Sequence, residues 1–455
     1  MPTDFEQLTQ KMQQVLQPEN SFDVEERQLL IGDRRATAWF VDAMTKDDVL
    51  ERLLSHMVTL TAEQLAGITA EQFARRHVPY TQATPEQDAQ TAAVQILAGQ
   101  TALLIEGFDA YLIIDLRSYP MRTLKEPEED RVMLGAHDGF CESVKTNIAL
   151  VRRRIRSTDF RVQHRVVGSK SHTDVAVCWL EGIAKPEDVQ LILQKIERID
   201  VGSLSMGHES LSEAMIKPKW FNPFPQFRYT ERPDRASAAI AEGKVLVMVD
   251  NSPIVSMLPT SLPDFAQDTN EYYFGPNIGT FLRWVRALII LVSLFLIPIW
   301  YTAEIYPTDD RWKIFMELMI AELVLDAVKL ATLHTPSSMG GMFGIIGTLI
   351  LGEFAVNSGL FGEGVLLLMA FQAVATFVQP SFPLGYAFKF YRLLLTGLAA
   401  LLGWWGFAGG VIILLVTAAT TKSIGGEGYL APFIPFRPAQ LWRLLSRRRI
   451  HKDNS

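Results

Sequence analysis

The sequence predicts an α/β soluble region of two related subdomains followed by an all-α polytopic membrane domain. Three observations lead to this fold class. Residues 1–280 carry 40 acidic and 29 basic side chains and residues 281–455 carry 10 and 14, so the two parts differ chemically. The first part repeats one order of strand and helix patterns. The second part holds the long uncharged apolar segments that a membrane helix requires.

The predicted division has six segments: an N-terminal extension (1–24), a first α/β subdomain (25–116), a charged connector (117–164), a second α/β subdomain (165–280), a transmembrane domain (281–436) with about four crossings plus an amphipathic helix (311–331), and a basic tail (437–455). The first residues, MPTDFEQLTQKMQQ, lack the basic and apolar regions of a signal peptide, so we expect the soluble region in the cytoplasm. Cys141 and Cys178 are too few and too far apart for a disulfide framework and read as thiols in a reducing compartment.

An internal repeat organises the first part. Residues 37–57 and 175–196 each read as an apolar strand, a turn and an amphipathic helix with an acidic first turn. Residues 92–116 and 237–259 each read as a helix ended by glycine, then a strand, a tight turn and a second strand. Two related subdomains are therefore expected to face or stack on one another. Their junction forms a ligand cleft or is scaffolding without a ligand, and the sequence leaves both open.

The first membrane crossing is expected at residues 287–303, which are uncharged. Arg283 and Arg286 precede it and place its start on the cytoplasmic side. Two further apolar segments, 341–359 and 364–378, read as helices joined by a glycine-containing turn.

Residues 393–421 are uncharged and form either one tilted span or a span broken at the WWGFAGG sequence in their centre. The basic tail faces the cytoplasm by the positive-inside rule, so the number of crossings is even. Four crossings leave Lys389 and Arg392 on the outer side, which conflicts with that rule.

The segment 311–331 is apolar but carries charge. Four of its charged side chains fall within a helical stripe about 60° wide: Arg311, Glu322, Asp326 and Lys329. Glu317 lies on the opposite side. One interpretation is an interfacial or re-entrant helix with a structural Asp326–Lys329 pair; the other is a helix that lines an aqueous pore in an oligomer.

Neither an enzyme nor a cofactor is expected. The sequence has no P-loop, no GxGxxG after a strand, no HExxH and no GxSxG. The histidines do not have metal-ligand spacing, so no metal site is predicted. The acidic soluble region disfavours nucleic acid as a partner, because phosphate binding requires a basic face.

The most distinctive stretch lies between the repeats and mixes dense charge with turn residues. It contains RSYPMR at 117–122, EPEEDRVMLG at 126–135, DGFCE at 138–142 and NIALVRRRI at 147–155. Further motifs are PFPQFRYTERPD at 223–234, HTPSSM at 334–339 and PFIPF at 432–436. Together these motifs resemble the signature of the A subunits of GerA-type bacterial spore germination proteins, along nearly the whole chain. The candidate interface residues in these motifs are Arg117, Glu126, Arg131, Asp138, Glu142, Arg152, Arg153, Arg154, Glu231 and Arg232.

The resemblance implies a multi-pass protein of the spore inner membrane that takes part in germination and assembles as a ring-shaped homo-oligomer with an ion channel. SFDV at Ser21–Val24 and HTPSS resemble a branch that looks like an accessory ion-release channel, which works with a small membrane partner protein and other germination proteins. The alternative is a non-conducting scaffold that organises germination receptors. Membrane lipid is a further expected partner. An acidic ring would favour cations, and the candidate ion path consists of Glu317, Glu322, Asp326, Glu353 and Glu363.

Overall fold

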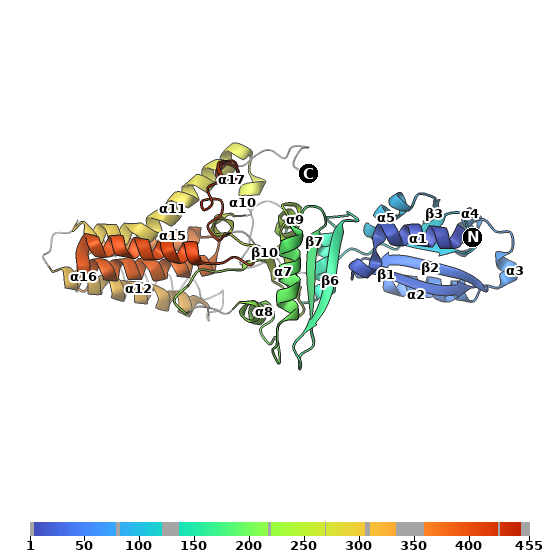
Figure 1. Cartoon of the computed structure of the whole chain (residues 1–455), viewed down its shortest axis with the longest axis horizontal. Coiled ribbons are helices and arrows are strands. Elements are labelled where there is room, and N and C mark those ends of the chain that lie inside the picture. Colours follow the sequence, from blue (N-terminus) through green and yellow to red (C-terminus); the bar gives the residue numbers. More distant parts are fainter. Residues whose placement is uncertain are drawn as a thin grey trace.

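Figure 1 shows the computed structural model as an elongated chain of three parts, with a first α/β unit at one end, a second in the middle and a helical region at the other end. The structure describes residues 4–78, 82–120, 136–216, 220–268, 270–304, 310–333, 359–425 and 428–446. We call residues 4–116 the first α/β unit, residues 136–268 the second α/β unit, and residues 270–446 the helical region.

The first α/β unit is built on an antiparallel five-stranded sheet with the order β1-β2-β4-β5-β3. Its strands are β1 (Val24–Ile31), β2 (Arg34–Val41), β3 (Ala83–Glu86), β4 (Thr101–Ile105) and β5 (Tyr111–Ile114). Its helices are α1 (Asp4–Leu16), α2 (Asp47–Val58), α3 (Ala62–Leu65), α4 (Ala70–His77) and α5 (Ala89–Leu97).

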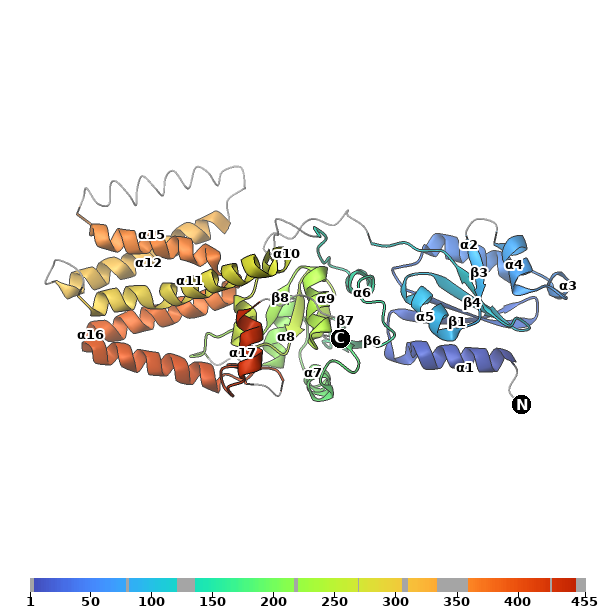
Figure 2. The same ribbon diagram turned by 90° about the horizontal axis from the view of Figure 1, so that it is seen from above.

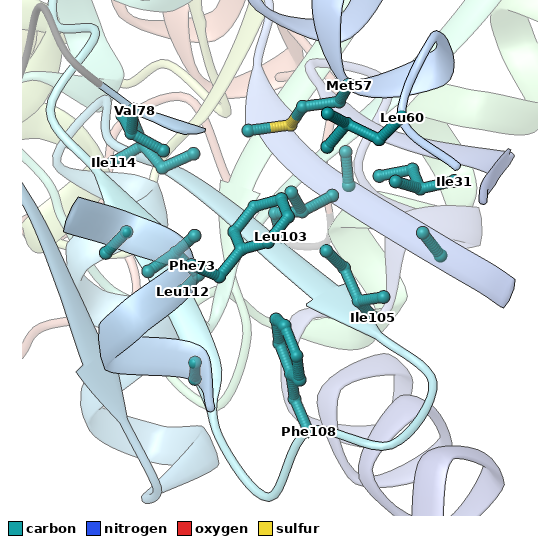
Figure 3. Close-up of a cluster of buried hydrophobic side chains, with 14 of the residues drawn as sticks. Ile31, Met57, Leu60, Phe73, Val78, Leu103, Ile105, Phe108, Leu112 and Ile114 are labelled. Atoms are coloured by element: carbon teal, nitrogen blue, oxygen red, sulfur yellow. The ribbon is translucent and has the colours of Figure 1, made fainter. Parts of the chain in front are cut away.

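Helices cover both faces of this sheet. Side chains alternate between the two faces along each strand, so one strand can contribute to both cores. In β4, Leu103 and Ile105 point into a core that also contains Met57 of α2 and Phe73 of α4 (Figure 3). Leu104 faces the opposite way, into a core shared with α1 and α5. All five residues of β4 (TALLI) are buried, and such a nearly continuous apolar run is typical of a strand with both faces covered.

The second α/β unit repeats this plan, with the sheet order β6-β7-β9-β10-β8. Its strands are β6 (Phe160–Val167), β7 (Thr173–Leu180), β8 (Arg228–Thr230), β9 (Val245–Val249) and β10 (Val255–Leu258). Its helices are α6 (Val144–Arg152), α7 (Pro186–Glu197), α8 (His208–Met215) and α9 (Pro233–Ala241). Each strand occupies the place of its counterpart in the first unit, which confirms the prediction of two related α/β subdomains.

The repeat begins one helix earlier than the sequence pattern indicated. Helix α1 packs beside α5 in the first unit, and α6 packs beside α9 in the second unit. Met12 of α1 and Ile148 of α6 are both fully buried in these cores. Residues assigned to an N-terminal extension and to a connector thus complete the two hydrophobic cores.

The helical region contains α10 (Asn270–Tyr273), α11 (Pro276–Thr302), α12 (Arg311–Leu333), α15 (Glu363–Val378), α16 (Phe382–Thr420) and α17 (Pro438–Leu445). Among the described residues, α11 and α16 are long and apolar enough to cross a membrane, and α15 is a shorter apolar helix. The second α/β unit is attached to these helices by an apolar core in which Phe224 and Phe265 pack against Leu294 of α11 and Tyr391 of α16.

Helix α16 is a helical hairpin. Its backbone reverses at Gly403, where φ is +59° and ψ is −137°, a conformation that favours glycine. The two arms lie side by side (Figure 2), and a Cβ atom at Gly410 would come within 2.7 Å of the Leu395 side chain. Of the two alternatives for this segment the structure shows the broken one, with the break at Gly403, directly before the WWGFAGG sequence.

Candidate functional site: an ion-pair network between helices

Four charged side chains meet between α12 and the first arm of α16, which run antiparallel. Glu322 and Asp326 lie one turn apart on α12, and Lys389 and Arg392 lie nearly one turn apart on α16. Residues at these spacings share one face of a helix. The two carboxylates of α12 therefore face the two cations of α16, although at least 63 residues separate the partners in sequence.

Glu322 and Arg392 form the buried centre of this network. The guanidinium Nη2 lies 2.6 Å from Glu322 Oε1, and Arg392 Nε donates to the same oxygen at 2.8 Å. Only 5% of the Glu322 residue and 4% of Arg392 is exposed. Arg392 Nη1 also donates to the backbone carbonyl of Ser293 on α11 at 3.2 Å, so the pair joins three helices.

Lys389 connects the centre to the rim of the network. Its ammonium group lies 3.1 Å from Glu322 Oε2 and contacts Asp326 Oδ2. The Asp326 side chain is 29% exposed. Its second oxygen, Oδ1, has no hydrogen-bond partner among the described residues. Asp326 is thus the most exposed of the four side chains, although its unpartnered Oδ1 atom is itself buried.

Pairing makes this arrangement possible between apolar helices. A buried charge without a partner costs several kcal/mol, whereas two carboxylates and two cations compensate one another. In this structure the Glu322 carboxylate is occupied by Lys389 and Arg392. A cation could bind Glu322 only after these ion pairs separate.

Glu317 and Glu363, also part of the predicted ion path, lie outside this network. Glu317, on the other side of α12, accepts a hydrogen bond from the Gly362 amide at 2.9 Å and lies 4.0 Å from Lys313. Glu363 is exposed at the start of α15. Glu353 lies outside the described residues. The structure thus brings together two of the five predicted carboxylates.

Asp326, which the sequence predicted to pair with Lys329, contacts Lys389 of α16. The sequence reasoning missed both cations of the network. Their signal was the conflict with the positive-inside rule at Lys389 and Arg392: two charges in an apolar stretch are expected to have partners.

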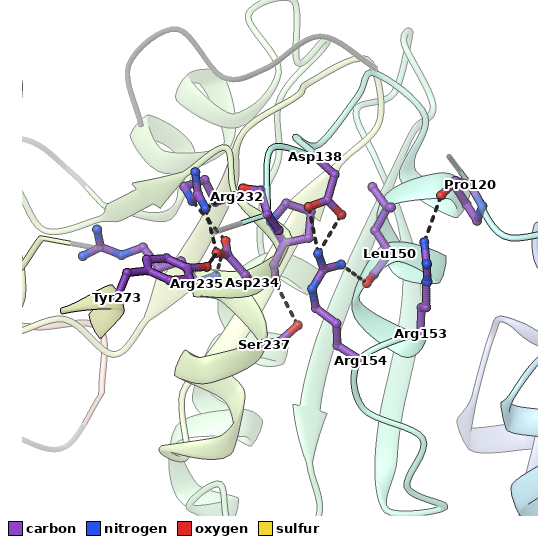
Figure 4. A network of polar contacts seen from close by, with 12 residues as sticks. Pro120, Asp138, Leu150, Arg153, Arg154, Arg232, Asp234, Arg235, Ser237 and Tyr273 are labelled. Carbon is purple, nitrogen blue, oxygen red and sulfur yellow. Dashed lines mark hydrogen bonds and ion pairs between the residues drawn. The ribbon is translucent and has the colours of Figure 1, made fainter. Parts of the chain in front are cut away.

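The candidate interface residues of the second α/β unit make contacts within the chain (Figure 4). Arg154 forms an ion pair with Asp138 at 2.6 Å, and Arg153 lies over the Tyr119 ring and donates to the Pro120 carbonyl at 3.5 Å. In the PFPQFRYTERPD motif, Arg232 binds Asp234 at 2.7 Å, and Asp234 also contacts the Tyr273 hydroxyl of α10.

Three other candidate interface residues also make contacts within the chain. The Glu231 carbonyl accepts from the Phe140 amide at 2.8 Å, and the Glu142 carbonyl accepts from the Asn251 amide at 2.7 Å. Arg117 pairs with its neighbour Asp115. Glu126 and Arg131 lie outside the described residues.

Arg152 joins the two α/β units. Its guanidinium Nε and Nη2 each donate to a different oxygen of Asp23 at 2.7 Å, and both side chains are almost fully buried. The Phe22 amide donates to the Val162 carbonyl of β6 at 3.0 Å. The SFDV sequence is therefore the joint between the units: it pairs with the edge of the second sheet and then enters β1.

A second charged joint connects the second α/β unit to the helical region. Glu271 of α10 is fully buried and pairs with Arg283 at 2.8 Å and with Arg286, both on α11. Arg283 Nη1 donates to the Leu444 carbonyl of α17 at 2.6 Å. These contacts fix the first turns of α11 to α10 and to the C-terminal helix.

No group of three or more histidine, cysteine, aspartate or glutamate side chains could hold a metal ion within the part of the chain that the structure describes. The arrangement supports ion pairing and helix packing. The fold and the site define the class of protein. It has two related α/β units attached to helices of membrane-spanning length, with an ion-pair network between the helices.

Comparison with known proteins gives the particular family. The model of the family "Bacillus/Clostridium GerA spore germination protein" matches residues 10–455, and the chain belongs to this family. The family resemblance predicted from the signature motifs is thereby confirmed.

Relatives match over most of their length. Stage V sporulation protein AF of Bacillus subtilis (strain 168) is 34% identical over 445 residues, which cover 94% of this chain and 89% of the relative. Spore germination protein KA of the same organism is 25% identical, with 92% and 80% covered. The crystal structure of the N-terminal domain of the A subunit of the Bacillus megaterium spore germinant receptor GerK3 is similar with a TM-score of 0.43 and 22% identity, and covers 55% of this chain and 92% of that chain.

Proposed function

We propose that this chain is a multi-pass protein of the spore inner membrane that acts in germination as a subunit of an oligomeric channel for monovalent cations. The family and its named germination and sporulation proteins support the biological process. The resemblance to the accessory branch supports a role in amplifying ion release, together with a small membrane partner protein. The observation that carries the proposal is the ion-pair network between α12 and α16.

The positions of the tryptophans support a membrane location for the helices. The end of α11, the start of α12 and the reversal of α16 lie at the same end of the helical region (Figure 2). Each of these places carries a tryptophan: Trp300, Trp312 and Trp404. Trp284 lies 16 residues before Trp300 on α11, about 24 Å along a helix axis. Tryptophans concentrate at both membrane surfaces, and this separation approaches the thickness of the hydrocarbon layer.

Between these two levels, an ionisable side chain costs free energy, so such residues are retained there mainly where they have a function. Glu322 lies ten residues from Trp312, about 15 Å into the helix, and is therefore deep in the proposed membrane layer. Ionisable groups at such depth are rare and mark ion or proton pathways. A helix that served only as an anchor would not need two carboxylates and two cations in its contact surface.

We propose that the paired network is the closed form of the path. Separation of α12 from the first arm of α16 would release Glu322 and Asp326 from Lys389 and Arg392. Free carboxylates repeated around an oligomer would form an acidic ring that favours cations. Within one protomer Glu322 is buried between helices and faces no open path. We therefore propose that the path forms between several copies of α12 in an oligomer.

Flux through proteoliposomes tests this proposal. Glu322→Gln combined with Asp326→Asn is expected to reduce K⁺ flux at least several-fold, because it removes both carboxylates of the path. Glu304→Gln is the matched control, since Glu304 is an exposed carboxylate at the end of α11 and pairs with Arg311. Size-exclusion chromatography confirms that the variants are folded. Equal flux in both variants would remove Glu322 and Asp326 from the path.

The alternative is a scaffold that organises germination receptors through its α/β units without conducting ions. The long α/β region that extends away from the helices favours this alternative (Figure 1). It predicts that partner binding survives replacement of the membrane carboxylates, and that no ion flux occurs with or without the small partner protein.

A further inference from the structure

A hollow with a volume of about 510 Å³ lies where the second α/β unit meets the end of α16. Lys195 of α7 lines one side, and Asn222 and Gln226 line a second. Thr420 and Lys422, at the end of α16, line the third. The hollow thus brings together two lysines that lie more than 200 residues apart in sequence.

The lining is cationic and polar. Lys195 donates to the Met215 carbonyl at 3.4 Å, and its other ammonium hydrogens remain available; Lys422 is exposed. Neither lysine forms an ion pair with any residue in the described ranges, and the described lining contains no carboxylate. The buried carboxylate of Asp188 lies close to Gly425, where a Cβ atom would meet its Oδ1 at 2.9 Å, but Asp188 does not line the hollow. An anion in the hollow would therefore meet two available ammonium groups.

The rim of the hollow carries the features of a membrane surface. Trp220 is 95% exposed and Phe221 53% exposed, next to a segment that is fixed to the helices. Asn222 donates to the Thr421 hydroxyl at 2.9 Å, and Phe224 is buried against α16. The two aromatic side chains are thus held at the end of a membrane-length helix, where such residues contact lipid headgroups.

An apolar surface leads away from the hollow along α16. Val416 and Ile413 lie four and seven residues before Thr420, so the three side chains share one face of the helix. All three are exposed. A molecule with a phosphate in the hollow could lay an acyl chain along this face.

We infer that the hollow binds the phosphate headgroup of an anionic glycerophospholipid from the adjacent membrane leaflet. The lysines bind the negative charge, the threonine and amide groups provide hydrogen bonds, and the exposed face of α16 contacts the acyl chain. This inference rests on the proposed membrane location of the helices and not on ion conduction. The bound lipid would fasten the second α/β unit to the membrane surface beside the end of α16.

Native mass spectrometry of the full chain in detergent tests the inference. The protein is titrated with phosphatidylglycerol, with phosphatidylcholine and with glycerol 3-phosphate. Lys195→Ala combined with Lys422→Ala is expected to weaken phosphatidylglycerol binding about 25-fold, because each lysine near an anionic lipid surface contributes roughly a fivefold factor. Lys46→Ala with Lys170→Ala is the matched control, since both are exposed lysines of the α/β units.

Lys195→Arg with Lys422→Arg keeps the charge and is expected to retain binding, which separates loss of the site from misfolding. Equal binding by the Ala variant and the control, or equal affinity for phosphatidylcholine, would overturn the inference. Displacement of the lipid by glycerol 3-phosphate at equal concentration would also overturn it, by assigning the site to a soluble phosphate. A chain that stays monodisperse without detergent would contradict the membrane location itself.

Discussion

The buried ion pair between Arg152 and Asp23 connects the two α/β units. Arg152→Met removes the guanidinium that holds both oxygens of Asp23, while the methionine side chain keeps much of the apolar packing. Arg152 is 1% exposed and the Asp23 side chain 5%, so water cannot replace the lost partner. Removing one member of a buried pair costs about 3–5 kcal/mol, because the other charge stays buried without compensation.

The control is a second ion pair across the same joint. Lys145 of α6 lies 2.6 Å from Asp42, which follows β2, but the lysine side chain is 54% exposed. Water and salt screen such a pair, so Lys145→Met is expected to cost about 0–1 kcal/mol. The comparison separates burial from the mere presence of a charge pair.

Hydrogen exchange of residues 21–24, read by mass spectrometry of the full chain, measures opening of the joint directly. The Phe22 amide donates to Val162 of the second unit, so it exchanges when the units part. Arg152→Met is expected to accelerate exchange at least about 100-fold, the equivalent of 3 kcal/mol. Asp23→Asn added to Arg152→Met is expected to recover part of the loss. Exchange no faster than in Lys145→Met would show that the buried Arg152–Asp23 pair does not hold the two units together.

Three further predictions concern single residues. A maleimide should label only Cys141 in the native protein and both cysteines after denaturation. Cys141 is partly exposed, whereas Cys178 is buried and burial raises the pKa of its thiol. Two labels in the native state would contradict this. Gly403→Ala should lower the free energy of unfolding by about 1–3 kcal/mol, since alanine disfavours positive φ. Gly397→Ala, where a Cβ atom meets open space, should not lower it. Thermal denaturation in detergent compares the two variants. Burial also lowers the pKa of His208, so the unfolded chain binds more protons and stability should fall as pH drops below about 6.5. His208→Asn should flatten this pH dependence in denaturation curves, and an unchanged slope would assign it to other groups.

The α/β region could be predicted because its strands carry strong local patterns. Segments such as TAWFV and VAVCWL are continuous apolar runs, and each is followed by a helix with an acidic first turn. The equivalence of α1 and α6 was missed because amphipathic helices of unrelated sequence cover the same sheet face equally well. Their apolar spacing, with Met12 and Leu16 one turn apart, was the available signal.

The network between α12 and α16 could be predicted only in part. Glu322 and Asp326 were placed together because positions four residues apart share a helix face. Their partners are set by helix packing, which no local pattern records. The sequence also could not decide whether α16 is one tilted helix or a broken one, because Gly403 permits a reversal of the backbone but does not require it.

Cation conduction by an oligomer of these helices is measured as current across a planar bilayer that holds the purified chain and the proposed small membrane partner protein. Under a KCl gradient, we expect single-channel steps that reverse near the K⁺ equilibrium potential, and loss of this selectivity in the Glu322→Gln, Asp326→Asn variant. Absence of current under all conditions, or reversal near the Cl⁻ equilibrium potential, would contradict it.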